Sequence, residues 1–247
     1  MNKTELLGRW TKEKSEELYG INNWGAGYFS ISEKGEVTVN PYKNNDAASV
    51  SIMDIISGVQ ERGLDMPVLL RFENLLDTQI AYLNDSFAEA MNKLNYKGVY
   101  RGVYPIKVNQ QKHVVEEITK FGQHYHHGLE VGSKAELIAA LSLIKDKEAC
   151  IICNGYKDEE FIDLGLYAIK MGFKCFFVLE FPGELDIVLE RSQALGVQPN
   201  MGIRIKLSAK AGGHWTESGG DRSLFGLNMS QLIEAVDILK EKNMLDC

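Results

Sequence analysis

A lysine near the end of an apolar run is the residue best placed for covalent chemistry. Lys107 lies within residues 99–110 (VYRGVYPIKVNQ), a stretch without acidic residues. Alternation along a strand puts Val103, Pro105 and Lys107 on one face, and α/β proteins build their sites at the C-terminal ends of parallel strands. Partial desolvation there favours the neutral, nucleophilic amine that Schiff-base chemistry requires. The spacing alone favours a lysine that extends from a strand end into solvent.

Two more charged side chains stand near the ends of predicted strands. Glu130 lies at the mouth of a helix that begins near Ser133, where the backbone dipole favours a carboxylate. Ser133 and Glu136 have the spacing of a capping box, so capping is the predicted role of Glu136. Arg204 lies within residues 201–207 (MGIRIKL), where two cations alternate with apolar residues and are predicted to face inward. An internal ion pair unrelated to substrate would give the same pattern.

Three other patterns do not amount to a site. Cys150 and Cys153 have CxxC spacing, but residues three apart in a strand point to opposite faces, which favours core cysteines. His124 and His126 share a face, yet nothing nearby completes a zinc set, so ordinary strand histidines and no metal site are predicted. Residues 25–27 (GAG) lack the third glycine of a dinucleotide loop, and no Walker lysine motif occurs, so nucleotide binding is not expected.

Alternating β-rich runs and helical patterns predict βα units and a parallel sheet from about residue 65 onward. The strands are expected at residues 67–72, 98–108, 126–131, 150–153, 175–180 and 199–207, and the last helix at residues 230–243. If the first run is a lead-in, five βα units follow it, whereas a closed barrel needs eight. Periodicity alone does not distinguish part of a barrel from an open sheet.

The first 64 residues are expected to form a separate N-terminal segment that contains β-structure. Residues 28–40 (YFSISEKGEVTVN) carry two alternating runs around a turn at Gly35, which predicts a hairpin. The second predicted domain is residues 65–247.

Composition limits the classes of partner. The chain has 247 residues, 45% hydrophobic and 25% charged, which is enough for a sizeable core and excludes wholesale disorder. A formal net charge of -7 opposes non-specific binding to nucleic acid or anionic membranes, so a small-molecule partner is predicted. Four cysteines indicate a reducing compartment, and no run reaches the roughly 18 apolar residues of a membrane span. A cytoplasmic location is expected.

Residues 104–109 (YPIKVN) resemble the pyridoxal-phosphate lysine motif of the biosynthetic arginine decarboxylases, within the alanine-racemase-like fold group. Residues 19–29 (YGINNWGAGYF), 128–137 (GLEVGSKAEL) and 219–223 (GGDRS) resemble further blocks of that family in the same order. Ornithine and diaminopimelate decarboxylases share the lysine and its strand. The block that contains Trp24 and Gly25, and the sequence YPIKVNQ at residues 104–110, favour a resemblance to the arginine enzymes. The family most often has lysine before Phe225, where this chain has Leu224.

The resemblance implies an incomplete pyridoxal-phosphate-binding (β/α)8 barrel, preceded by the β-containing N-terminal segment. It implies that Lys107 binds the cofactor as a Schiff base and that L-arginine is converted to agmatine and CO2, in polyamine biosynthesis. Glu130 is then either a cofactor-side carboxylate or an ordinary helix charge, and Arg204 supports the site. A magnesium requirement and a homo-oligomeric parent enzyme are implied by the resemblance only.

The same resemblance places several functional parts after Cys247. These are a histidine that stacks on the cofactor ring, the glycine-rich phosphate grip, the acid that binds the pyridine nitrogen, and a substrate-binding β-domain. The chain is therefore expected to be an N-terminal fragment that is inactive by itself. Two alternatives remain open: a stand-alone, noncatalytic pyridoxal-phosphate-binding barrel, and a noncatalytic partner of a full-length homologue.

Overall fold

The computed structural model describes residues 10–43, 48–206 and 223–247. The chain divides into two compact units, Met1–Gln79 and Ile80–Cys247. No helix within these described ranges is both long enough and apolar enough to cross a membrane.

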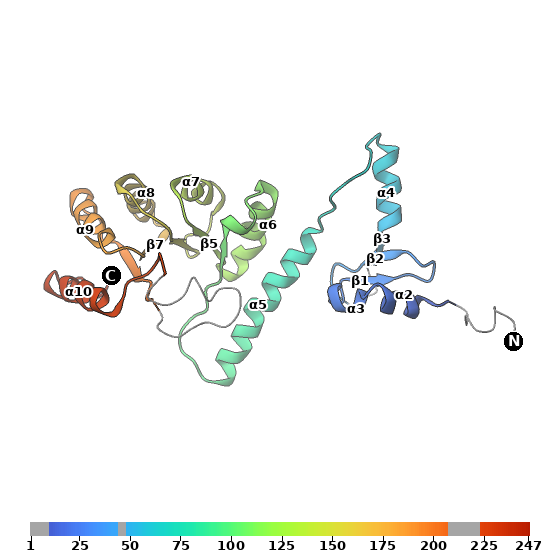
Figure 1. Cartoon of the computed structure of the whole chain (residues 1–247), viewed down its shortest axis with the longest axis horizontal. Coiled ribbons are helices and arrows are strands. Elements are labelled where there is room, and N and C mark those ends of the chain that lie inside the picture. Colours follow the sequence, from blue (N-terminus) through green and yellow to red (C-terminus); the bar gives the residue numbers. More distant parts are fainter. Residues whose placement is uncertain (1–9, 44–47, 207–222) are drawn as a thin grey trace, which may run out of the picture. The chain divides into compact units, whose positions relative to one another are not determined.

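The first unit combines a small antiparallel sheet with short helices (Figure 1). Its elements are α2 (Lys12–Leu18), α3 (Ile21–Trp24), β1 (Phe29–Ile31), β2 (Val37–Val39), β3 (Val50–Ser51) and α4 (Ile52–Glu61). The predicted hairpin is confirmed, because β1 pairs with β2 in antiparallel register. Gly35 has φ +81 in the turn, a conformation that glycine adopts without strain.

The boundary between these two compact units lies inside the long helix α5 (Glu73–Lys93). The first turns of this helix belong to the first unit. The Tyr28 hydroxyl lies 2.7 Å from the Thr78 hydroxyl and accepts a hydrogen bond from Gln79 Nε2 at 2.8 Å. The phenol is buried, so these bonds satisfy a polar group that would otherwise be costly.

The second unit is a five-stranded parallel sheet whose strands follow one another in sequence order. Its strands are β4 (Val103–Pro105), β5 (Gly128–Val131), β6 (Cys150–Cys153), β7 (Lys174–Leu179) and β8 (Asn200–Ile203). Helices α6 (Lys112–Gly122), α7 (Lys134–Leu143), α8 (Glu159–Lys170), α9 (Glu184–Leu195) and α10 (Met229–Glu241) form an arc outside the strands (Figure 1). This order confirms the predicted series of βα units.

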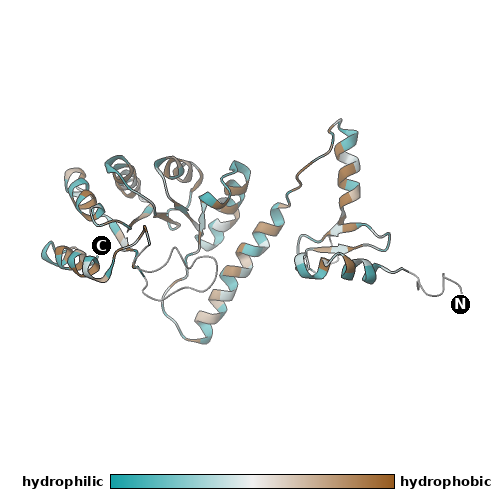
Figure 2. Ribbon diagram, viewed as in Figure 1, coloured by the Kyte–Doolittle hydropathy of each residue, from teal (hydrophilic) through white to brown (hydrophobic). Residues whose placement is uncertain are grey.

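The core of this unit lies between the sheet and the helical arc. Burial alternates along β6, where Ile151 and Cys153 are fully buried while Cys150 and Ile152 are half-buried. Strand β7 shows the same alternation. Side chains of a strand alternate between its two faces, so one face of the sheet is covered by helices and the other is only partly covered. The strands are mainly apolar, and hydrophilic residues gather on the helices (Figure 2).

Three sequence expectations about elements are wrong. Residues 67–72 form neither helix nor strand, because the run is largely exposed and no burial offsets the ordering of an extended chain. The strand expected at 98–108 is confined to β4 and is followed by a 3₁₀ turn, η2 (Ile106–Val108). His124 is not a strand histidine either, since it lies in a second 3₁₀ turn, η3 (Gln123–Tyr125), and His126 follows it with φ +53.

Candidate functional site

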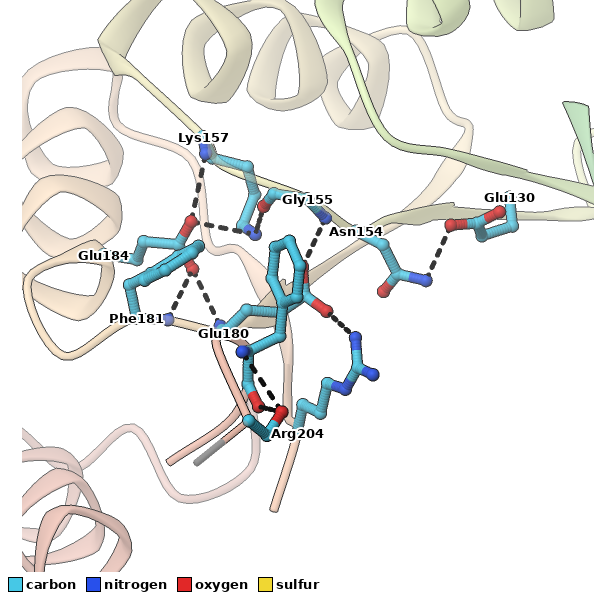
Figure 3. Close-up of polar contacts among 10 residues, drawn as sticks. Glu130, Asn154, Gly155, Lys157, Glu180, Phe181, Glu184 and Arg204 are labelled. Atoms are coloured by element: carbon cyan, nitrogen blue, oxygen red, sulfur yellow. Dashed lines mark hydrogen bonds and ion pairs between the residues drawn. The ribbon is translucent and has the colours of Figure 1, made fainter. Parts of the chain in front are cut away.

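Polar side chains gather where neighbouring parallel strands end. The strand register aligns Glu130 on β5 with Ile152 on β6, and Ile152 with Phe176 on β7. Val178, two residues after Phe176, is aligned with Gly202 on β8. Backbone hydrogen bonds continue this ladder one residue beyond β6 and β8. Side chains two positions further along the last three strands therefore share the face of Glu130. The polar residues at the carboxyl end of this face include Glu130, Asn154, Glu180 and Arg204 (Figure 3).

Lys107 lies at the carboxyl end of β4, within the turn η2, which contacts β5. The partial desolvation predicted for its ammonium is not found among the described residues, because the side chain is exposed. Within those residues it makes no hydrogen bond and no ion pair. Its neighbour Ile106 is 3% exposed and belongs to the core, which anchors the turn that carries the amine.

Glu130 is a buried carboxylate with one satisfied oxygen. The side chain is 7% exposed, and its Oε1 accepts a hydrogen bond from Asn154 Nδ2 at 2.9 Å (Figure 3). The other oxygen, Oε2, is buried and has no hydrogen-bond partner among the described residues. A buried carboxylate oxygen without a partner is costly, which is typical of a site that receives a polar group from elsewhere.

Arg204 pairs with a second buried carboxylate. Its Nη1 lies 2.5 Å from Oε1 of Glu180, whose side chain is 1% exposed, whereas the arginine side chain is 52% exposed. The guanidinium carbon also lies 5.5 Å from the centre of the Phe225 ring. Arg204 therefore lies on the same sheet face as Glu180, as the alternation along residues 201–207 predicts.

A buried lysine and two glutamates form a network that sequence reasoning missed. Lys157 is 0% exposed, and its ammonium lies 3.1 Å from Oε1 of Glu184, the first residue of α9 (Figure 3). Glu180, directly after β7, bonds both Arg204 and the backbone N–H of Gly155. A polar residue next to the carboxyl end of each buried strand was the available signal, because such ends carry function in parallel sheets.

The capping box predicted at Ser133 and Glu136 is only partly formed. Ser133 caps α7 by accepting the N–H of Glu136, as predicted, but the Glu136 carboxylate accepts the N–H of Gly132 instead of that of Ser133. Most of the glycine-rich loop at 212–223 lies outside the described residues. Leu224 is 82% exposed, so this position, where the resembling family most often has lysine, carries an apolar side chain in solvent.

The cysteine expectation is confirmed in part. Cys153 is fully buried in the core, whereas Cys150 is only half-buried on the opposite face of β6 and is not a core residue. Sγ of Cys153 instead lies 3.4 Å from Sγ of Cys175 on the neighbouring strand, and all four cysteines are free thiols. This hydrogen bond, together with burial, raises the pKa of the Cys153 thiol well above its usual range.

Comparison with known proteins identifies relatives of the whole chain. Residues 81–246 match the family model described as pyridoxal-dependent decarboxylase, pyridoxal binding domain. The chain is 46% identical over 236 residues to the biosynthetic arginine decarboxylase of Gloeobacter violaceus, a match that covers 96% of this chain and 36% of that protein. It is 45% identical to the enzyme of the same name from Bacteroides thetaiotaomicron, over 98% of this chain and 38% of the relative. The chain therefore spans little more than a third of the length of these relatives.

Solved structures agree with this relationship. The crystal structure of the biosynthetic arginine decarboxylase from Campylobacter jejuni matches with a TM-score of 0.79 and 36% identity, over 92% of this chain and 36% of that chain. A diaminopimelate decarboxylase from M. jannaschii matches with a TM-score of 0.63 at 22% identity, over 88% and 45% of the two chains, which bears on the fold alone. The fold expected from the sequence, part of an alanine-racemase-like barrel, is confirmed.

Proposed function

The chain belongs to the pyridoxal-dependent decarboxylase family through its pyridoxal binding domain, and we propose that it is the cofactor-binding part of a biosynthetic arginine decarboxylase. The observation that carries the proposal is the identity of 46% to a named arginine decarboxylase across 96% of this chain. The substrate assigned to the whole enzyme is L-arginine, and the products are agmatine and CO2.

The residues at the carboxyl edge fit a pyridoxal phosphate cofactor. Lys107 offers an exposed primary amine, the group that forms a Schiff base with an aldehyde. Glu130 offers a buried oxygen that still needs a hydrogen-bond donor or a cation. We assign covalent attachment of the cofactor to Lys107 and a polar contact with it to Glu130, and we assign Arg204 to the same site.

The chemistry divides between cofactor and protein. When bound, pyridoxal phosphate accepts the electron pair that the departing carboxylate leaves on the substrate. Lys107 would hold the cofactor through its primary amine at the carboxyl end of β4. Glu130, fixed by Asn154, would orient the bound group, and the guanidinium of Arg204, held by Glu180, would lie beside it. The 247 residues by themselves are predicted to be inactive, because they span little more than a third of their relatives.

Three properties of the whole enzyme stay predictions. No group of three or more His, Cys, Asp or Glu side chains in the described part of the chain could hold a metal ion, so we assign no magnesium site to it. We propose a cytoplasmic location because the four free cysteines suit a reducing compartment, and a homo-oligomeric enzyme from the family resemblance alone.

The test is chemical trapping on the full-length protein that contains this chain. Borohydride reduction in the presence of pyridoxal phosphate, followed by peptide mass spectrometry, is expected to place the label on Lys107. The variant Lys107→Ala should lose the label and agmatine formation, whereas Lys112→Ala, which removes a solvent-exposed lysine of α6, should keep both. Label on another lysine, or arginine left unchanged by the wild type, would contradict the proposal.

A further inference from the structure

Lys157 is the most deeply buried cation of the described chain. It lies in the loop after β6, its side chain is 0% exposed, and its ammonium donates to the Gly155 carbonyl at 2.6 Å and lies 3.1 Å from Glu184 Oε1. A buried ammonium is tolerated only when it is paired and hydrogen-bonded, and both partners are present here.

The partner carboxylate fixes the turn at the end of β7. Glu184 accepts the backbone N–H of Lys157 at 3.0 Å, of Glu180 at 2.8 Å and of Phe181 at 3.3 Å. The side chain of Glu184 is 2% exposed, so without the ammonium its charge would be buried with backbone donors only. The ion pair therefore stabilises the conformation in which the backbone of Glu180 is tied to Glu184.

Glu180 connects this ion pair to the candidate site through hydrogen bonds to Gly155 and Arg204. Its Oε2 accepts the N–H of Gly155 at 2.5 Å, and its Oε1 lies 2.5 Å from Arg204 Nη1 (Figure 3). Gly155 is thus bonded through its carbonyl to Lys157 and through its N–H to Glu180. It has φ +73, and an added Cβ would lie 2.6 Å from the Gly132 carbonyl oxygen, so the loop accepts only glycine here.

We propose that Lys157 is a positioning residue of the cofactor site. Its ammonium holds Glu184 and the Gly155 loop, and these hold Glu180 in the orientation that directs Arg204 toward the site. The inference rests on the proposed function, because it takes the site that Arg204 faces to be the pyridoxal phosphate site.

The experiment compares Lys157→Met with Arg191→Met. Arg191 makes a bidentate pair with Asp163 between α8 and α9, so its variant also removes one ion pair but leaves the carboxyl edge untouched. The first readout is the amide proton of Gly155 in the cofactor-free 247-residue chain, observed by NMR with selective glycine labelling. A short bond to a carboxylate moves this resonance downfield, and Lys157→Met should move it upfield, whereas Arg191→Met should not.

The second readout is the affinity of the full-length protein for pyridoxal phosphate, followed by the absorbance of the lysine-bound cofactor. Lys157→Met should weaken binding by about tenfold or more. Removal of a residue that orients a ligand-binding side chain has an effect of this size at metal sites, and we expect a similar effect here. Glu184→Gln, which keeps the side-chain shape, should weaken it in the same direction if Lys157→Met does not fold.

The outcomes separate this inference from the proposed function. A wild-type protein that never binds pyridoxal phosphate would overturn the proposed function and, with it, the positioning role assigned to Lys157. A wild type that binds normally, together with a Gly155 resonance unchanged in Lys157→Met, would overturn the positioning role alone. So would variants that lose thermal stability yet bind the cofactor as tightly as the wild type.

Discussion

Asn154 Nδ2 donates a hydrogen bond of 2.9 Å to Oε1 of Glu130 across the ends of β5 and β6, and the second oxygen of that carboxylate is buried without a partner among the described residues. The amide fixes the direction of the carboxylate while leaving half of its hydrogen-bonding capacity unused. A buried charge in this state lowers the stability of the cofactor-free chain. A buried oxygen without a hydrogen-bond partner is expected where a ligand supplies the missing contact.

Glu130→Gln should therefore raise stability and lower cofactor affinity. The amide side chain is neutral, so the change removes a desolvated charge and is expected to raise the free energy of unfolding of the cofactor-free chain by about 1 kcal/mol. Urea denaturation measures this quantity. The matched control is Glu89→Gln, because that glutamate is exposed on α5 and should change stability by less than about 0.5 kcal/mol. A destabilised Glu130→Gln chain would indicate that Oε2 is satisfied in solution.

Gly128 allows β5 and β6 to pair. An added Cβ at this position would lie 1.9 Å from the backbone oxygen of Cys150, and a backbone atom cannot move aside without disrupting the ladder. Gly128→Ala is expected to destabilise the second unit by about 3 kcal/mol or more. Gly202→Ala on β8 is the control, because its Cβ would meet only Val178 at 3.6 Å, an ordinary contact. Equal urea midpoints for the two variants would disprove the steric argument.

The sheet was largely predictable from sequence, whereas its polar network was not. Residues 150–153 belong to an apolar run that ends before Asn154, and the observed strand has the bounds that were expected. The run at 67–72 is also apolar in part, but it is exposed, and a sequence pattern does not report whether another element will cover it.

The same limit applies to the candidate site. Lys107, Glu130 and Arg204 follow apolar runs and could be placed at the carboxyl edge by counting along strands. Lys157 and Glu184 lie 27 positions apart, one in a loop and one at a helix start, and neither has a local pattern. Their pairing depends on how β6 and β7 lie side by side, which only tertiary structure determines.

The cysteines should react with thiol reagents at different rates. Cys153 is buried and its thiol pKa is raised by the hydrogen bond to Cys175 and by burial, so few thiolates form at pH 8. Burial also raises the pKa of the Cys150 thiol. We expect the half-buried Cys247 to react first with a chromogenic disulfide reagent, and all four thiols to react in denaturant. Cys247→Ser should remove the fast phase, and its persistence in that variant would contradict the assignment.

His127 should make the stability of the second unit depend on pH. Its ring is 6% exposed, with Nδ1 unpartnered among the described residues, and burial lowers the pKa of the imidazole below its usual 6.5. Between the lowered folded-state pKa and about 6.5, the unfolded chain binds a proton that the folded chain does not. The free energy of unfolding should therefore fall as pH decreases below about 6.5, by at most about 1.4 kcal/mol per pH unit from this group.

The measurement is the urea midpoint at pH 7.5, 6.5 and 5.5. In His127→Gln, which has no titratable group at this position, the midpoint should change less with pH than in the wild type. His113→Gln, a change at an exposed histidine of α6, should retain the wild-type dependence. The ring is closely surrounded, since a Cβ on Gly102 would lie 2.5 Å from Nδ1, so a protonated imidazole has no room for a compensating water on that side. Parallel pH curves for the wild type and His127→Gln would show that another group carries the dependence.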